Sequence, residues 1–206
     1  MHNAKAFHAY LNRFVPLSDE EFQSYVLPFI TVRRYEQKQI VTRAGEVEDY
    51  LNFIVKGLVR KYYEKDGAQV NTQFSYEKHL VHSQESFHSR TPSEYTVETL
   101  EPTTFISITY DNLEEIYSKD VKMERLARKV ITHTMVQRDR WQMKMIKLTP
   151  RQRFLMFIEC YPNLLQRVPQ KHLASFLNIQ PETFSRFKHL MKERSNVKDL
   201  PPARVS

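Results

Sequence analysis

Glu182 and Arg186 stand four residues apart near the C-terminus, in a segment that Pro181 would open as a helix. A spacing of four places both side chains on one helical face, and Ser185 lies beside them. A carboxylate can accept a hydrogen bond from the amino group of cytosine, and a guanidinium can donate two hydrogen bonds to guanine. The chemistry available to this face is therefore recognition of base edges in a DNA groove, and His189 is a fourth candidate for it.

Side chains suited to phosphate binding surround the same segment. Contacts to phosphates give affinity for DNA but do not select a sequence. Residues 144–206 carry 12 Lys and Arg against 4 Asp and Glu, so the whole positive excess of the chain lies in its last third. Such asymmetry is expected of a module that binds a polyanion. The candidate phosphate contacts are Lys171, Thr183, Lys188 and Lys192.

Two short helices joined by a tight turn would position these side chains. Pro169 can open the first helix, and Asn178 can end it because asparagine tolerates the left-handed conformation. Ala174 supplies the small side chain that two closely packed helices need. The spacing of small, turn and core positions predicts a helix-turn-helix, with a plain helical hairpin as the alternative. The expected inner faces consist of Leu173, Phe176, Leu177, Ile179, Phe184, Phe187 and Leu190.

The sequence upstream of this segment has a different pattern of residues. Between residues 31 and 110, short β-branched and aromatic runs alternate with turn residues, and all three glycines, Gly45, Gly57 and Gly67, border such runs. This pattern predicts a β-sandwich or jelly roll. We therefore expect an α+β fold in three parts. These are an N-terminal jelly roll (double-stranded β-helix) in residues 1–117, a long central helix in 118–147 and an all-α helix-turn-helix domain in 148–206.

The expected central helix contains neither glycine nor proline and carries a heptad-like stripe. Such a stripe packs either on the jelly roll of its own chain or against the same helix of a second chain. Its polar members, His133 and Gln137, suit a helix pair better than a core, so we expect part of the stripe to form a homodimer. The stripe consists of Met123, Leu126, Val130, His133, Gln137 and Trp141.

Two motifs resemble the Crp/Fnr superfamily of bacterial transcription regulators. The run from Glu182 to Arg186 looks like the E-x-x-S-R recognition signature of that family, and the run from Gly45 to Arg60, followed by Gly67, looks like the core of its cyclic nucleotide-binding jelly roll. The resemblance implies a homodimeric, sequence-specific DNA-binding regulator that an N-terminal effector-sensing domain controls. Its recognition helices would read G·C pairs in the two halves of a palindromic operator. RNA polymerase would be a further partner.

The effector pocket that the resemblance implies would contain Glu77, Arg90, Ser93 and Tyr95. Members that bind cyclic AMP carry a Gly-Glu pair and an arginine for the phosphate. Here Glu77 lacks the glycine, and the arginine position falls at Ser93 or Glu94, so cyclic AMP is not expected. The effector is then another small molecule, or there is none.

Pro181 departs from the family pattern too, because it replaces a common arginine at the start of the recognition helix. Gln180 is also a weaker helix cap than the usual serine or threonine. These two departures support an alternative function, a ligand-sensing protein whose degenerate helix-turn-helix acts through a protein partner.

Other functional classes find little support. A single cysteine, Cys160, allows no disulfide framework within one chain and suits a reducing cytoplasm. No apolar run is long enough to span a membrane, and we expect a cytoplasmic protein. No catalytic triad, phosphate-binding loop or paired cysteine motif is present, so we expect neither an enzyme nor a catalytic residue. No metal site is expected from the cluster of His79, His82, Glu85 and His88.

Overall fold

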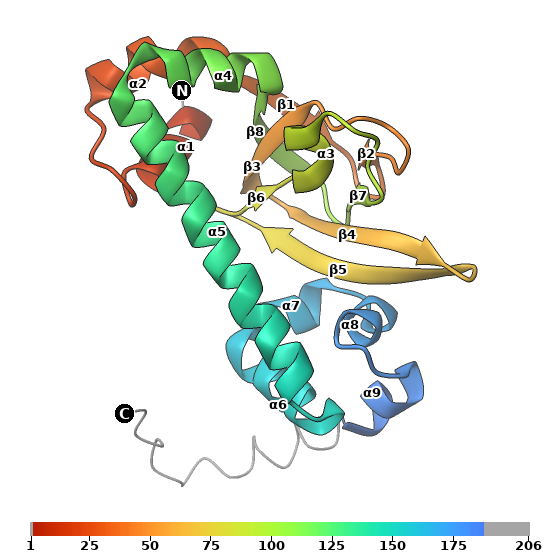
Figure 1. The fold of residues 1–206 in the computed structure, drawn as a ribbon. Coiled ribbons are helices and arrows are strands. Elements are labelled where there is room, and N and C mark those ends of the chain that lie inside the picture. The colour runs from red at the N-terminus through yellow and green to blue at the C-terminus, as the bar shows by residue number, and fades with distance from the viewer. Residues whose placement is uncertain (1, 188–206) are drawn as a thin grey trace, which may run out of the picture. The chain divides into compact units, whose positions relative to one another are not determined.

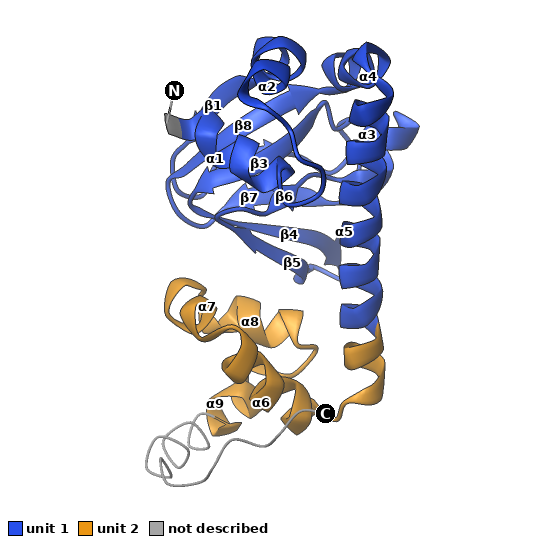
Figure 2. Cartoon of the chain, turned by 90° about the vertical axis from the view of Figure 1, so that its left-hand side faces the viewer, with its two compact units in different colours: residues 1–142 blue, residues 143–206 orange. Residues whose placement is uncertain are grey.

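The protein is described by a computed structural model that covers residues 2–187 of the 206. The chain divides into two compact units, residues 1–142 and 143–206, which Figure 2 distinguishes by colour. This division falls within the expected central helix. None of the described helices is both long and apolar enough to cross a membrane.

Two four-stranded antiparallel sheets form the centre of the first unit (Figure 1). The strand order is β1-β8-β3-β6 in one sheet and β2-β7-β4-β5 in the other. Apolar side chains from both sheets meet between them, among them Ile54, Val59 and Phe105. The expected jelly roll is thus confirmed. The strands are β1 (Thr31–Tyr35), β2 (Ile40–Thr42), β3 (Tyr50–Lys56), β4 (Leu58–Lys65), β5 (Ala68–Tyr76), β6 (Leu80–Val81), β7 (Thr96–Thr99) and β8 (Thr103–Thr109).

Helices cover the other face of the β1-β8-β3-β6 sheet. Phe53 on β3 and Ile106 on β8 are fully buried in a second core that N-terminal helices and later helices complete. A capping box starts α2, since Glu21 N donates to Ser18 Oγ and Ser18 N donates to Glu21 Oε2. The helical elements of this unit are α1 (His2–Leu11), α2 (Asp19–Tyr25), the 3₁₀ helix η1 (Leu27–Phe29), α3 (Gln84–Ser89), α4 (Tyr110–Lys119) and the long α5 (Val121–Lys147).

The long helix begins three residues later than the sequence predicts. Ser118 belongs to α4, and Asp120 has an extended backbone, with φ −163° and ψ 141°, that separates the two helices. The Oδ1 atom of Asp120 accepts a hydrogen bond from Lys122 N at 2.7 Å, so this side chain caps the new helix. A local cap therefore overrides the uninterrupted helical pattern of the sequence.

The first two members of the expected stripe, Met123 and Leu126, pack within their own chain, which is the alternative that the sequence left open for part of the stripe. Met123 is 1% exposed and Leu126 is 5% exposed, because both pack into the helix-covered core of their own unit. Val130 packs against the same core, and the ring of His133 lies edge-on to Phe14, with centroids 5.4 Å apart. The heptad-like spacing thus reflects packing within the chain along this part of α5.

The second unit is helical, as expected. Thr149 caps α6 with a capping box, and Pro150 occupies its first turn. Phe154, Phe157 and Leu173 are completely buried, and the ring of Phe154 meets that of Phe184 with centroids 5.2 Å apart. After the end of α5, the described helices are α6 (Pro150–Cys160), α7 (Pro162–Arg167), α8 (Gln170–Phe176) and α9 (Pro181–Phe187).

Candidate nucleic-acid interface and sensor interior

Helices α8 and α9 form a helix-turn-helix whose turn depends on Asn178. This residue has φ +51°, the left-handed conformation that the sequence predicts for it. The turn is closed by two backbone hydrogen bonds of 3.0 Å, from Asn178 N to Ser175 O and from Ile179 N to Ala174 O. Ala174 has no exposed surface, which agrees with its expected place between two closely packed helices.

The outer face of α9 presents the charged pair. Glu182, Ser185 and Arg186 are exposed, whereas Phe184 on the opposite face is 1% exposed. Neither Glu182 nor Arg186 makes an ion pair with any residue in the range 2–187. An acid and a guanidinium are therefore both available to a ligand from one helical face.

Of the other residues predicted to contact DNA, two are described by the structure. Thr183 is half-buried, and its Oγ1 accepts a long hydrogen bond of 3.4 Å from Arg186 Nη2. Lys171 is exposed in the first turn of α8. The remaining three, Lys188, His189 and Lys192, lie outside the described residues.

Arg153 on α6 holds the helix-turn-helix in place. Its buried guanidinium donates hydrogen bonds to four main-chain carbonyl oxygens at 2.9–3.1 Å. Sequence reasoning missed this residue, because two of its partners lie 24 and 25 positions away in the chain. Its partners are the carbonyl oxygens of Met145, Leu148, Leu177 and Asn178.

In the first unit, two of the four residues predicted for the effector pocket stabilise the local backbone. Glu77 Oε1 accepts a hydrogen bond from Gly57 N at 2.9 Å, between β3 and β4. Arg90 donates to the carbonyl oxygen of Glu48 and to Asp49 Oδ1, both at 2.7 Å, after the end of α3. These contacts give both side chains a structural role.

The other two predicted pocket residues lie together. The Oγ atom of Ser93 donates to Tyr95 O at 2.8 Å and accepts from Tyr95 N at 3.0 Å. The centroid of the partly buried Tyr95 ring lies 5.0 Å from the buried Lys61 Nζ. Tyr95 therefore lies next to a group of buried polar side chains that the sequence did not predict.

That group centres on Lys61 of β4 and His82, which follows β6. Burial lowers the pKa of Lys61 to about 8, and the charge of Arg138 acts in the same direction. Burial also lowers the pKa of His82 to about 3, with smaller contributions from Lys61, His88 and Arg138. His82 Nε2 and the neighbouring Ser83 Oγ are buried without a hydrogen-bond partner among the described residues.

A buried carboxylate, Glu48, organises the loop beside this group. Its Oε2 accepts hydrogen bonds from Thr42 Oγ1 at 2.7 Å and from Ser83 N at 3.2 Å, and its Oε1 accepts one from Tyr50 N at 3.1 Å. Burial raises the pKa of Glu48, and these hydrogen bonds oppose the shift. Glu48 therefore fixes where the Ser83 backbone lies.

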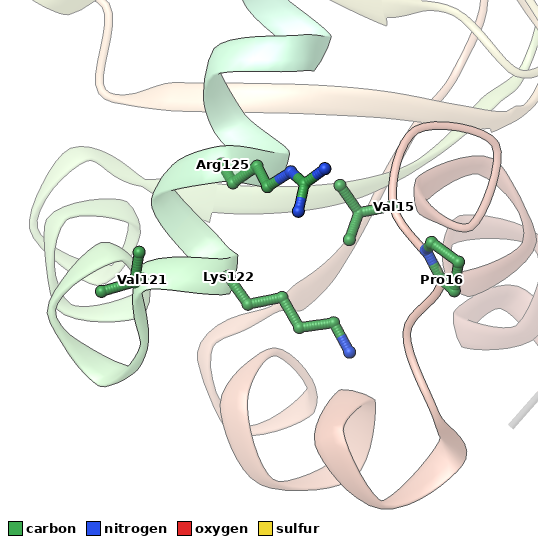
Figure 3. A pocket seen from close by; sticks show the side chains of 5 residues that line it. All are labelled: Val15, Pro16, Val121, Lys122 and Arg125. Carbon is green, nitrogen blue, oxygen red and sulfur yellow. The ribbon is translucent and has the colours of Figure 1, made fainter.

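A surface hollow of about 490 Å³ lies beside the start of α5 (Figure 3). Val15, Pro16 and Val121 supply its apolar lining, and Lys122 and Arg125 extend toward it from the helix. Lys122 Nζ is neutralised by the Glu21 carboxylate, whose oxygens lie 2.5 and 2.7 Å away. The hollow thus defines no particular ligand chemistry.

The first unit matches a known domain family. Residues 32–120 match the family model described as the cyclic nucleotide-binding domain. The matched segment covers the two sheets except Thr31, together with α3 and α4, so the first unit has the fold of that domain. Comparison with curated protein sequences gives no match.

Solved structures extend the likeness to the second unit. FixK2 from Bradyrhizobium japonicum aligns with a TM-score of 0.66 at 18% identity, over 85% of this chain and 90% of its own. CLP of Xanthomonas campestris, described as a c-di-GMP responsive global regulator, aligns with a TM-score of 0.66 at 16% identity, over 91% and 96%. The catabolite activator protein of Thermus thermophilus aligns with a TM-score of 0.55 at 17% identity, over 94% and 91%. The chain therefore has the fold of the Crp/Fnr regulators, which confirms the resemblance at the level of the fold.

Proposed function

We propose that this protein is a sequence-specific DNA-binding transcription regulator that binds a palindromic operator as a homodimer. The observation that carries the proposal is the outer face of α9, where Glu182 and Arg186 are exposed and make no ion pair within the described residues. In a protein that bound no anion or base, two such charges one helical turn apart would gain by pairing with each other. The absence of an ion pair at both charges suits a surface whose partner supplies the complementary groups.

Each side chain on this face has a distinct task in the proposed complex. Arg186 donates two hydrogen bonds to O6 and N7 of guanine, and Glu182 accepts one from N4 of cytosine. Ser185 supports this base contact, and Lys171 and Thr183 bind phosphates, which fix the helix in the groove. His189 belongs to the base-reading set and Lys188 and Lys192 to the phosphate set of the same proposal.

Replacing Arg186 with alanine should reduce discrimination between operator and random DNA by about 1–3 kcal/mol, or roughly 5- to 150-fold. The operator would first be obtained by selecting fragments that the purified protein retains. Both variants would then be titrated with operator and random DNA at several salt concentrations. Arg151→Ala is the matched control, because Arg151 is an exposed arginine on α6 of the same unit.

Arg151→Ala removes the same charge and should leave the ratio of the two affinities unchanged. A wild-type ratio for Arg186→Ala would contradict the proposal. Binding that does not weaken as salt is raised would favour the alternative, a degenerate helix-turn-helix that contacts a protein.

The proposed dimer uses a face of α5 that differs from the predicted stripe. Ile131 and Met135 lie one turn apart on this helix and are 42% and 64% exposed. Large apolar side chains at neighbouring exposed positions are typical of an interface. Because Met123 and Leu126 are buried within their own unit, we place the second copy of the chain against Ile131 and Met135.

Met135→Glu should therefore convert the dimer to a monomer, since each subunit would bury an unpaired carboxylate, at a cost of about 3–5 kcal/mol. Sedimentation equilibrium measures this change directly. Gln137→Glu is the control: Gln137 is exposed two positions away and belongs to the stripe that the sequence predicted. If Gln137→Glu dissociates the dimer and Met135→Glu does not, the interface lies on the predicted stripe instead.

A further inference from the structure

The hollow beside the start of α5, which by itself defines no ligand chemistry, has a neighbour along the same helix. The second hollow has a volume of about 480 Å³. Its lining comes from the two loop residues before Val15 and from the next turns of α5 after Arg125. The residues that line the second hollow are Arg13, Phe14, Arg128, Lys129, Thr132 and His133. We call the two hollows together the α5 groove.

The lining of the α5 groove is positively charged. It contains five lysine and arginine side chains and no aspartate or glutamate. Lys122 is neutralised by Glu21, and no other cation of the lining makes an ion pair within residues 2–187. Lys129 Nζ donates to the carbonyl oxygen of Phe14 at 3.1 Å, which adds no negative charge. The cations without an ion pair are Arg13, Arg125, Arg128 and Lys129.

The same groove exposes apolar surface. Val121, in the first turn of α5, is 80% exposed, and Pro16 in the same hollow is also exposed. Protein–DNA interfaces are more polar than protein–protein interfaces, and phosphates have no use for an exposed valine. Apolar contact points between cations that lack a counter-charge therefore favour an acidic protein segment over nucleic acid as the occupant.

The length of the groove sets the size of such a segment. From Val121 to His133 the helix rises about 18 Å, which an extended chain of roughly five or six residues would span. The C-terminal residues of this chain do not supply it, because residues 188–206 contain five Lys and Arg against two Asp and Glu. Their positive charge would be repelled by the groove, so the occupant comes from another molecule.

We propose that the α5 groove binds an extended acidic segment of a partner protein. Carboxylates of the segment would pair with Arg13 and Arg125, and an apolar side chain would pack on Val121. The proposal goes beyond the proposed function, because it requires neither operator DNA nor a ligand inside the jelly roll. The groove is also distinct from the proposed dimer face, since Arg125 lies roughly 120° around the helix from the direction of Ile131 and Met135.

Fluorescence anisotropy of a labelled peptide, Glu-Glu-Leu-Glu-Glu-Leu, titrated with the full-length protein at low ionic strength tests the proposal. The wild type should bind this peptide and should not bind Lys-Lys-Leu-Lys-Lys-Leu. Arg13→Glu combined with Arg125→Glu should weaken binding at least about tenfold, because each change replaces an attraction with a repulsion. Arg34→Glu combined with Lys65→Glu is the matched control, since it changes the net charge equally at two exposed positions of the first unit.

Val121→Ser is a second, uncharged variant whose high exposure makes misfolding an unimportant concern. It should weaken binding of the leucine peptide roughly threefold, because part of an apolar contact is lost. Binding of Glu-Glu-Ser-Glu-Glu-Ser should be the same for Val121→Ser and for the wild type. This comparison separates the apolar contact from the attraction between charges.

The proposal is overturned if the wild type does not bind the acidic peptide, or if the groove variant and the matched control bind it equally. Equal binding would mean that the peptide responds to net charge alone. Sedimentation equilibrium and titration with random DNA examine the other occupants. Loss of the dimer in Arg13→Glu with Arg125→Glu would assign the groove to a second copy of the chain, and weaker DNA binding than the control would assign it to nucleic acid. Either result overturns the proposal.

Discussion

Replacing Gly57 with alanine should destabilise the first unit by about 3 kcal/mol or more. Gly57 connects β3 to β4 with φ +113°, a backbone conformation that L side chains rarely adopt. A Cβ atom at this position would lie 2.3 Å from Thr103 Oγ1 and 2.7 Å from Thr103 Cα. Because one of these atoms belongs to the main chain at the start of β8, a side-chain rotation cannot relieve the contact.

The same glycine donates its N–H to Glu77, so a shift of the turn would also break that hydrogen bond. Thermal melting of the full-length chain measures the loss. Gly67→Ala is the control, because Gly67 also has a positive φ, +75°, but no atom lies within 4 Å of its added Cβ. Gly67→Ala should cost only about 1–2 kcal/mol. A loss as large as that of Gly57→Ala would show that backbone conformation, and not the contact with Thr103, determines the effect.

Arg153→Met should destabilise the C-terminal unit by about 3–5 kcal/mol. Methionine fills much of the same volume but cannot donate to any of the four carbonyl oxygens that the guanidinium holds. Main-chain carbonyls that lose a buried donor carry a desolvation cost of about 1–3 kcal/mol each, and access of water would reduce the total. Loosening of Leu177 and Asn178 should also weaken binding to operator DNA, because these residues form the turn before α9.

Hydrogen exchange of peptides from residues 150–187 reports the stability of this unit separately from the first unit. Arg151→Met provides the control, since Arg151 is exposed two positions earlier on the same helix. It should exchange at the wild-type rate, whereas Arg153→Met should exchange faster throughout the peptides. Equal exchange in all three proteins would mean that the four hydrogen bonds of Arg153 contribute little.

The helix-turn-helix could be predicted because its determinants are local. Asn178 tolerates the left-handed conformation, and Ala174 is small where the helices meet, so a few positions specify the turn. The jelly roll was also predictable, because short β-branched runs bordered by glycine have few other folds. In both cases the signal lies within about ten residues of the feature that it predicts.

Features that depend on distant segments were not predictable in this way. The spacing of Met123 and Leu126 shows that a face of α5 is buried, but not which element covers it, and the N-terminal helices cover it here. Glu77 and Arg90 were expected in an effector pocket, yet the residues that they contact, Gly57 and Asp49, lie 20 and 41 positions away in the chain. The sequence does indicate that Lys61 shares a strand face with the core residue Val59, because the two are two positions apart. Whether that face is buried at Lys61 depends on both sheets, which the local sequence does not show.

The four hydrogen bonds of Arg153 to carbonyl oxygens also limit how the end of α5 can move relative to α9. Two of them are made to Met145 and Leu148 at the end of α5, and two are made to the turn that leads into α9. We therefore expect the short connection at Leu148 and Thr149 to be restricted in its motion and not to act as a flexible hinge. A rotation of the last turn of α5 should therefore be transmitted through Arg153 to the turn before α9.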